Sequence, residues 1–220
     1  MRIAVVGVAT DVGKTWVGAR LLEALRAEGL VVAARKPVQS FEPGNDGGTD
    51  ADALAAATGE APCDVCPPHR WYPVPMAPPM AADALGRDPF GAVELLGELA
   101  WPDQLDVGLV ETVGGARSPL SADADSATFA RLVEPDRTLL VADAGLGTIN
   151  AVRLSVDALS GLDPLVYLNR YDDANDLHQR NRAWLTDRDR LQVVTGAHAL
   201  RAELGLASGA DKSGGSRRRS

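Results

Sequence analysis

The chain has 220 residues, of which 45% are hydrophobic and 24% charged, so it is long enough to bury one sizeable core. Acidic residues outnumber basic ones by 30 to 22, for a formal net charge of −8. A broad nucleic-acid surface is therefore not expected, because phosphate binding needs a surplus of cations on one face. No apolar run reaches the roughly 18 residues needed to cross a bilayer, and the first residues show no signal-peptide pattern. These features predict a soluble, cytoplasmic protein without membrane or nucleic-acid partners.

Short apolar runs alternate with helical stretches along the chain, which is typical of an α/β fold with a parallel sheet covered by helices on both faces. Strands are predicted at residues 3–8, 30–34, 107–110, 138–142, 165–168 and 191–194. Helices are predicted at residues 14–28, 50–58, 90–100, 124–133, 149–159 and 177–185. We expect a single domain over residues 1–207 and a disordered tail of Gly, Ser and Arg over 208–220.

Residues 59–79 hold many prolines and are expected to form a long irregular loop, which in a compact domain is usually functional. This loop contains Cys63 and Cys66, with His69 nearby. Such a pair can be half of a zinc site, but no second pair follows at zinc-finger spacing. Two prolines come directly after Cys66, where a redox pair would open a helix. We interpret the two cysteines as an ordinary reduced pair in a loop.

The most specific motif is Gly7-Val8-Ala9-Thr10-Asp11-Val12-Gly13-Lys14-Thr15, between the first predicted strand and the first predicted helix. Such a loop cradles a nucleoside triphosphate: backbone amides and the helix N-terminus face the phosphates, the lysine offsets their charge and the threonine hydroxyl binds Mg²⁺. Five residues separate the two glycines, where the common pattern has four. The alternative is a glycine-rich turn with a solvated lysine. The strand and helix on either side favour a P-loop NTPase-like nucleotide site.

Three further polar residues follow predicted strands. Lys36 lies at the carboxyl end of the second strand, where parallel sheets bind their ligands, although a solvated lysine is the simpler interpretation of that position alone. Glu111 ends the strand at 107–110 and can hold a metal ion beside the phosphates. Asp52 lies near the start of a helix, and by itself this position is more typical of a helix cap.

Taken together, the motifs resemble the dethiobiotin synthetase family. In chain order they are Gly-x₅-Gly-Lys-Thr at 7–15, Lys-Pro-Val-x-Ser at 36–40, Asp-Ala-Leu at 52–54, Val-Glu-x-x-Gly-Gly at 110–115, Pro-Leu-Ser at 119–121, Gly-Leu-Gly-Thr-Ile-Asn at 145–150 and Leu-Asn at 168–169. The resemblance covers most of residues 1–170 and implies a P-loop fold. It also implies an ATP- and Mg²⁺-dependent ligase of biotin biosynthesis, which closes a cyclic urea from 7,8-diaminononanoate and CO₂ through a phosphorylated carbamate.

The resemblance further implies roles for individual residues. Those expected to act on the phosphates, the carbamate or the diamine are Lys14, Lys36, Thr10 and Ser40. Those expected to bind the nucleotide are Asp11, Val12, Gly13, Lys14, Thr15, Glu111, Gly114 and Asn169, the last facing the adenine. Those expected to hold Mg²⁺ are Thr15, Asp52 and Glu111. The substrate carboxylate of the neighbouring subunit is expected to bind at Gly147, Thr148, Ile149 and Asn150. This sharing of a site between subunits implies a homodimer.

Three alternatives stay open at this point. A related P-loop synthetase could act on another substrate, because residues 76–80 and 111–115 depart from the family pattern. A partitioning-type switch ATPase would make no small-molecule product, but such proteins carry an extra lysine early in the loop and residues 8–12 contain none. A diverged binding module could keep the nucleotide without turnover.

Overall fold

The first strand separates two hydrophobic layers. In β1 (Arg2–Gly7), Ile3 and Val5 belong to one core cluster and Ala4 and Val6 to the other, and all four residues are fully buried. Side chains alternate between the faces of a strand, so a strand that is apolar on both faces must be covered on both sides. The computed structural model describes residues 1–44 and 47–206 and places β1 in the middle of the molecule.

β1 belongs to a six-stranded sheet in which each neighbouring pair is parallel and the order is β2-β5-β1-β6-β7-β8. The other strands are β2 (Val32–Arg35), β5 (Val107–Gly115), β6 (Arg137–Asp143), β7 (Leu165–Asn169) and β8 (Val193–Val194). The chain runs from β1 to β2 on one side and later crosses to β6 on the other. The carboxyl end of β1 therefore lies at a switch point of the sheet, where open α/β sheets bind ligands.

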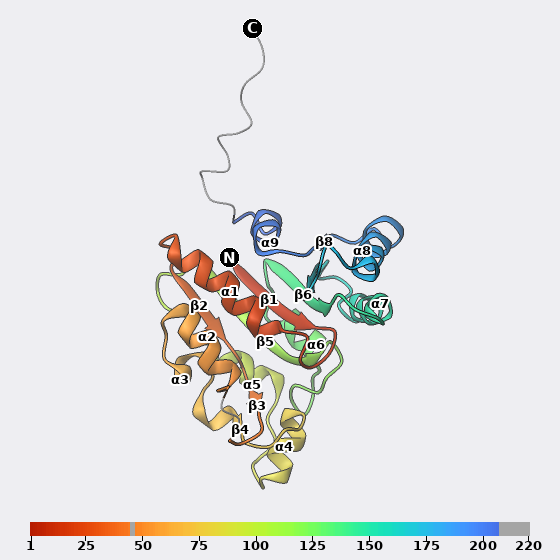
Figure 1. Ribbon diagram of the computed structural model, residues 1–220. Coiled ribbons are helices and arrows are strands. Elements are labelled where there is room, and N and C mark those ends of the chain that lie inside the picture. The colour runs from red at the N-terminus through yellow and green to blue at the C-terminus, as the bar shows by residue number, and fades with distance from the viewer. Residues whose placement is uncertain (45–46, 207–220) are drawn as a thin grey trace.

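Helices cover both faces of the sheet (Figure 1). On one face lie α1 (Lys14–Ala27), α2 (Asp50–Thr58) and α9 (Ala197–Glu203), which supply residues to the first core cluster. On the other lie α6 (Ser126–Leu132), α7 (Thr148–Ala158) and a π-helical turn, η2 (Trp184–Arg188), which follows α8 (Asp176–Ala183). The prediction of a parallel sheet with helices on both faces is confirmed.

The proline-rich segment is more ordered than its composition predicts. It contains α3 (Pro62–Val65), the 3₁₀ turn η1 (Pro68–Arg70) and β4 (Trp71–Tyr72), and β4 pairs with β3 (Gln39–Ser40) in a small parallel sheet. After it come α4 (Pro78–Ala84) and α5 (Ala92–Gly97). A third core cluster orders this region: Tyr72 stacks on Phe90 with ring centroids 5.7 Å apart, and both lie in one cluster with Val110 of β5.

Both cysteines are free: Cys63 is exposed on α3, and Cys66 is buried, which raises the pKa of its thiol to about 12. Across residues 1–44 and 47–206 there is no cluster of three or more His, Cys, Asp or Glu side chains arranged to bind a metal. The helices within these ranges are all too short or too polar to cross a membrane. The tail expected to be disordered lies outside the described residues.

Candidate active site

The phosphate loop joins β1 to α1 at the switch point, and its two glycines are sterically required. A Cβ on Gly7 would lie 2.8 Å from the carbonyl oxygens of Ala9 and Gly114, closer than side chains tolerate. Gly13 caps α1 with a φ of +92°, and a Cβ there would lie 2.1 Å from Nδ2 of Asn169. No side chain caps the N-terminus of α1, so its first backbone amides remain open to an anion.

Lys14 lies across the mouth of this loop. Its Nζ donates hydrogen bonds to the carbonyl of Gly114 at 3.0 Å and to that of Ala9 at 3.3 Å. Burial, and then the nearby ammonium of Lys36, lower the pKa of Lys14 below the usual lysine value. The charge of Lys14 is thus held by neutral carbonyls, and an incoming phosphate would stabilise it.

Lys36, itself buried, is at the centre of a charge cluster that reaches the surface at Asp50. Its Nζ lies 2.6 Å from Oε1 of Glu111 and 2.8 Å from Oδ2 of Asp50, and it donates to the carbonyl of Thr112 at 3.2 Å. Burial alone would lower the pKa of Lys36, but the two carboxylates outweigh it and raise that pKa. Lys36 in turn lowers the pKa of Asp50 to about 2. Lys36 therefore stays protonated, and the cluster carries two carboxylates for one ammonium.

The hydroxyl of Thr15 joins the same cluster. Its Oγ1 lies 2.8 Å from Oδ1 of Asp50 and also 2.8 Å from Oε1 of Glu111. One hydroxyl proton cannot serve both carboxylates, and Oε2 of Glu111 is buried without a hydrogen-bond partner. Burial, opposed by Lys36, raises the pKa of Glu111. This set of oxygens thus has spare capacity to bind a cation.

The structure assigns the carboxylate beside Thr15 to Asp50 instead of Asp52. Oδ2 of Asp52 accepts hydrogen bonds from the backbone amide and the hydroxyl of Thr49, both at 2.8 Å, in a capping box at the start of α2. Residues two apart on a helix point in different directions, so Asp50 faces the cleft when Asp52 faces the cap. The metal role expected for Asp52 from the resemblance is therefore not supported by its position, and the capping role expected from the residue alone is observed. Asp50 was missed, although Thr49-x-x-Asp52 is itself a capping-box pattern and would have left Asp50 as the free acid.

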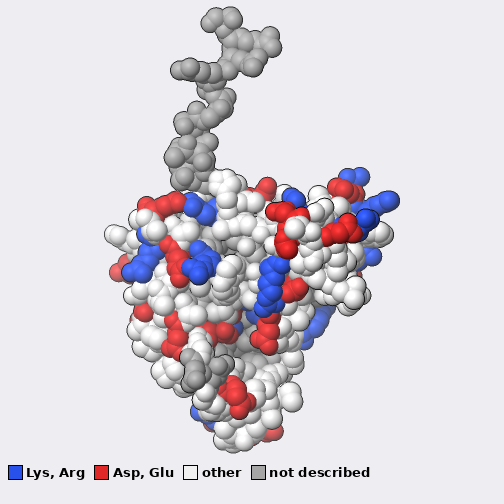
Figure 2. All heavy atoms as spheres, viewed as in Figure 1, with Lys and Arg blue, Asp and Glu red and all other residues white. Residues whose placement is uncertain are grey.

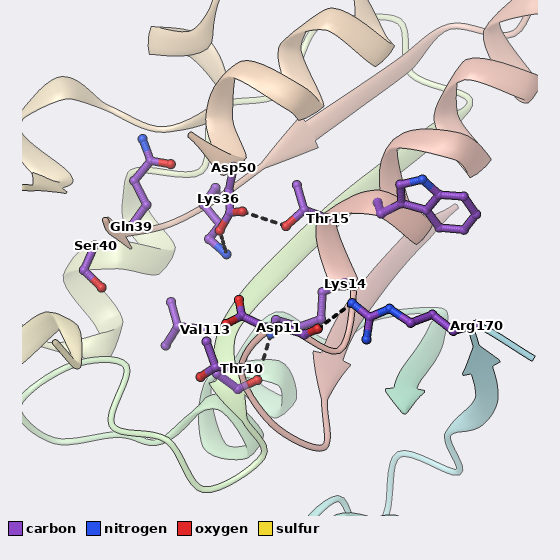
Figure 3. Close-up of a pocket in the computed structure, with 13 residues that line it drawn as sticks. Thr10, Asp11, Lys14, Thr15, Lys36, Gln39, Ser40, Asp50, Val113 and Arg170 are labelled. Atoms are coloured by element: carbon purple, nitrogen blue, oxygen red, sulfur yellow. Dashed lines mark hydrogen bonds and ion pairs between the residues drawn. The ribbon is translucent and has the colours of Figure 1, made fainter. Parts of the chain in front are cut away.

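The loop and the charge cluster open on one cleft of about 360 Å³ (Figure 3). The predicted site residues that line it are Thr10, Asp11, Gly13, Lys14, Thr15, Lys36, Ser40 and Gly114. The lining residues that sequence reasoning missed are Trp16, Gln39, Asp50, Val113 and Arg170. Glu111 lies fully buried beneath this cleft as part of the charge cluster.

Asn169 supports the phosphate loop from below. Its side chain is buried, and Nδ2 donates a hydrogen bond to the carbonyl of Val12 at 2.9 Å. The next residue, Arg170, donates to the carbonyl of Asp11 at 2.9 Å and pairs with Asp143 at the end of β6 at 2.8 Å. Two successive side chains at the end of β7 thus hold the loop backbone in place.

The predicted carboxylate-binding segment lies beside the cleft. Gly147 caps α7 with a positive φ and without a side-chain hydrogen bond, and the amide of Thr148 donates only a long hydrogen bond, 3.4 Å, to the carbonyl of Gly145. Asn150 lines a neighbouring groove of about 650 Å³ together with Arg117 and Ser118, and Thr10 lines both this groove and the cleft. The two hollows therefore meet at the phosphate loop.

A parallel sheet with a glycine-bounded loop between a central strand and a helix, and with a lysine and threonine opening that helix, defines a P-loop nucleotide-binding α/β protein. A family model described as an AAA domain matches residues 1–163. The ATP-dependent dethiobiotin synthetase of Anaeromyxobacter sp. strain Fw109-5 is 40% identical, over 70% of this chain and 69% of the relative. The ATP-dependent dethiobiotin synthetase of Haloferax mediterranei is 37% identical, over 87% of this chain and 82% of the relative. The chain belongs to the dethiobiotin synthetase family.

A solved structure shows the same fold at low sequence identity. The signal recognition particle receptor FtsY from Elizabethkingia anophelis aligns with a TM-score of 0.54 and 15% identity over 90% of this chain. This chain spans about 60% of the length of that receptor chain. The likeness concerns the P-loop fold alone.

Proposed function

We propose that the protein is an ATP-dependent dethiobiotin synthetase, which closes a cyclic urea from 7,8-diaminononanoate and CO₂. The observation that carries the proposal is the convergence of Lys14 and Lys36 on one cleft beside the phosphate loop. Both lysines are buried, whereas basic and acidic side chains lie intermixed on the face seen in Figure 2. The sequence holds only three lysines, and two of them meet where a carbamate and a triphosphate would bring together several negative charges.

The proposed reaction has three steps. One amine of the diamine attacks CO₂ and loses a proton, which gives a carbamate. A carbamate oxygen attacks the γ-phosphorus of ATP, the bond to the β,γ-bridging oxygen breaks, and ADP leaves. The second amine then attacks the carbonyl carbon of the carbamoyl phosphate, loses a proton and expels inorganic phosphate, which closes the five-membered cyclic urea.

In this proposal, Lys14 contacts the β- and γ-phosphates and Lys36 contacts the carbamate and the γ-phosphate. Lys14 would exchange the carbonyls of Ala9 and Gly114 for phosphate oxygens. Thr10 and Ser40 would orient the carbamate or diamine. Thr10 lines both hollows at the loop, and Ser40 is held by donating a hydrogen bond to the carbonyl of Met76 at 2.6 Å.

The oxygens beside the loop fit Mg²⁺. This ion prefers hydroxyl, carboxylate and phosphate oxygens, and Thr15, Asp50 and Glu111 offer two carboxylates, a hydroxyl and one unpartnered oxygen. Bound there with ATP, Mg²⁺ would offset charge that develops on the phosphate oxygens. Before Mg²⁺ binds, Lys36 neutralises part of the negative charge of Asp50 and Glu111.

The proposal includes a homodimer in which residues 147–150 bind the substrate carboxylate presented by the other subunit. The N-terminus of α7, which no side chain caps and which lies next to the groove that shares Thr10 with the cleft, supports this assignment. Sedimentation of the purified protein tests the dimer. A strictly monomeric active enzyme would contradict it.

The decisive assay incubates the purified protein with Mg·ATP, bicarbonate and 7,8-diaminononanoate, and follows both ADP and dethiobiotin. We expect ADP release that depends on the diamine and matches the dethiobiotin formed. ADP release that is indifferent to the diamine would instead support a switch ATPase. Release stimulated only by another amine or carboxylate would support a related synthetase, for which Val113 is relevant because it lines the cleft and lies in the segment 111–115 that departs from the family pattern.

A further inference from the structure

The pairing of β5 with β1 is interrupted directly beside the cleft. Val5 of β1 pairs with Glu111 of β5, and Gly7 pairs with Gly115. Between these two pairs β1 has one residue, whereas β5 has three, residues 112–114. Residues 112–114 therefore form a bulge in β5. Bulges bend a strand and change the direction in which its groups point.

This bulge directs two of its carbonyls at the two lysines of the cleft. The carbonyl of Thr112 accepts a hydrogen bond from Nζ of Lys36 at 3.2 Å, and the carbonyl of Gly114 accepts one from Nζ of Lys14 at 3.0 Å. A carbonyl has no net charge, so it orients an ammonium group without neutralising it. One short backbone segment thus sets the direction of both cations.

Two buried hydroxyls hold the bulge in place. Oγ1 of Thr112 donates a hydrogen bond to the carbonyl of Val5 at 3.1 Å. Oγ of Ser126, at the start of α6, donates one to the carbonyl of Val113 at 2.7 Å. Thr112 and Ser126 are both fully buried. Because a bulge interrupts the backbone ladder, buried backbone groups there need other partners, and these hydroxyls supply them.

We propose that Thr112 is a positioning residue for the reaction: its hydroxyl, bonded to Val5, fixes the bulge that aims Lys36 and Lys14 into the cleft. The inference rests on the proposed function for the roles of the two lysines. Two ammonium groups in one cleft repel each other, so each needs a fixed partner to stay there. Ser126 supports the same bulge from α6.

This arrangement has a consequence for the kinetics. A bulge that shifts moves the partners of both lysines together, so the binding of ATP and the transfer of its γ-phosphate should weaken together. Thr112 lies within the segment 111–115 that departs from the family pattern, so its hydroxyl is a feature of this chain's own sequence.

The test compares Thr112→Val with Thr138→Val in the full-length protein, because valine keeps the shape of threonine and lacks its hydroxyl. Thr138 is a matched control. It is 2% exposed and pairs with Ala4 near the start of β6, at the opposite end of this strand from the cleft. Its Oγ1 has no hydrogen-bond partner among the described residues.

Steady-state assays would measure kcat and KM for Mg·ATP at a temperature where thermal scans show each variant to be folded. Calorimetry would measure the binding of Mg·ATP without the diamine. Thr112→Val should weaken ATP binding several-fold and lower kcat by roughly tenfold or more, because a small misplacement of a catalytic group is costly. Thr112→Ser keeps the hydroxyl and should keep most of both. Thr138→Val should change neither.

The affinity for ATP separates positioning from a merely structural role, because a smaller folded fraction lowers kcat without changing KM. The inference is overturned if Thr112→Val matches the wild type, if only its kcat falls, or if Thr112→Ser or Thr138→Val loses as much. Should Thr112→Val fail to fold, Ser126→Ala decides, and wild-type kcat and ATP affinity in that variant would overturn the inference. A wild type that binds Mg·ATP but makes no dethiobiotin would overturn the proposed function, and the calorimetric comparison would still decide the inference.

Discussion

Two clusters in this molecule each combine one cation with two carboxylates. In the first, Lys36 lies between Asp50 and Glu111 under the cleft. In the second, on the proline-rich side, Arg70 pairs with Glu94 and with both oxygens of Glu98, and its guanidinium lies over the ring of Phe90. Both cations are buried.

The clusters differ in how completely their hydrogen bonds are satisfied. The planar guanidinium of Arg70 matches the carboxylate of Glu98 with two parallel hydrogen bonds, and Glu94 and Glu98 keep access to water. The ammonium of Lys36 is a point charge that leaves Oε2 of Glu111 unpartnered in the interior. The first cluster is thus prepared to accept another group, whereas the second is complete and joins α5 to the proline-rich segment.

The largest effect is expected from Lys36→Met. This change leaves the fully buried carboxylate of Glu111 without its counter-ion, which should lower the free energy of unfolding by about 3–5 kcal/mol and abolish diamine-dependent ADP release. Urea unfolding and the coupled assay measure the two effects. Adding Glu111→Gln removes the unpaired charge and should restore part of the stability but no activity. A variant that turns over normally would exclude Lys36 from the reaction.

Lys14→Met should abolish turnover without loss of stability. Burial lowers the pKa of Lys14, so the charged ammonium costs more free energy in the folded than in the unfolded chain, and this cost lessens only as the pH rises towards the ordinary lysine pKa. The variant should therefore unfold at the same temperature as the wild type or higher at pH 7, with a difference that shrinks at pH 10. Thermal scans at both pH values check this, and marked destabilisation at pH 7 would contradict it.

Arg70→Met should lower stability without changing turnover, the opposite of the effect expected for Lys14→Met. It removes the hydrogen bonds to Glu94 and Glu98 and the contact with Phe90, which should cost about 1–3 kcal/mol of stability. The kcat and KM for ATP should stay within error of the wild type, because Arg70 does not line the cleft. A strong loss of kcat at temperatures where the variant is folded would show that the second cluster also serves the reaction.

The sequence predicts best where local signals and tertiary packing agree. The helix at 50–58 is found with the predicted bounds, because a capping box begins it and Gly59 ends it in a left-handed conformation. The strand predicted at 107–110 instead continues to Gly115, since pairing with β1 carries it past the apolar run, with Glu111 opposite Val5 and Gly115 opposite Gly7. Such pairing is invisible in a local pattern.

In the candidate site, too, local motifs could be predicted from the sequence and tertiary contacts could not. The loop and Lys36 were found from motifs, because phosphate binding fixes both residue type and spacing. Trp16 and Arg170 were missed, since nothing in their own segments marks them. They reach the cleft because α1 begins and β7 ends at the same edge of the sheet.

The smallest effect is expected from Asp52→Ala, which tests where the site ends. This substitution removes the cap of α2 and should cost about 1 kcal/mol of stability, measured by urea unfolding, while kcat changes little. The matched variant Asp50→Asn, two residues away, should keep the cap but lose most of the turnover at low Mg²⁺, because its carboxylate faces Thr15 and Lys36. If instead Asp52→Ala raised the Mg²⁺ requirement and Asp50→Asn did not, the helix would have to rotate on binding ATP, and the acid expected from the family motif would be the ligand. The two variants therefore decide whether the charge cluster of Lys36, Asp50 and Glu111 already has the geometry of the metal site or must rearrange when ATP binds.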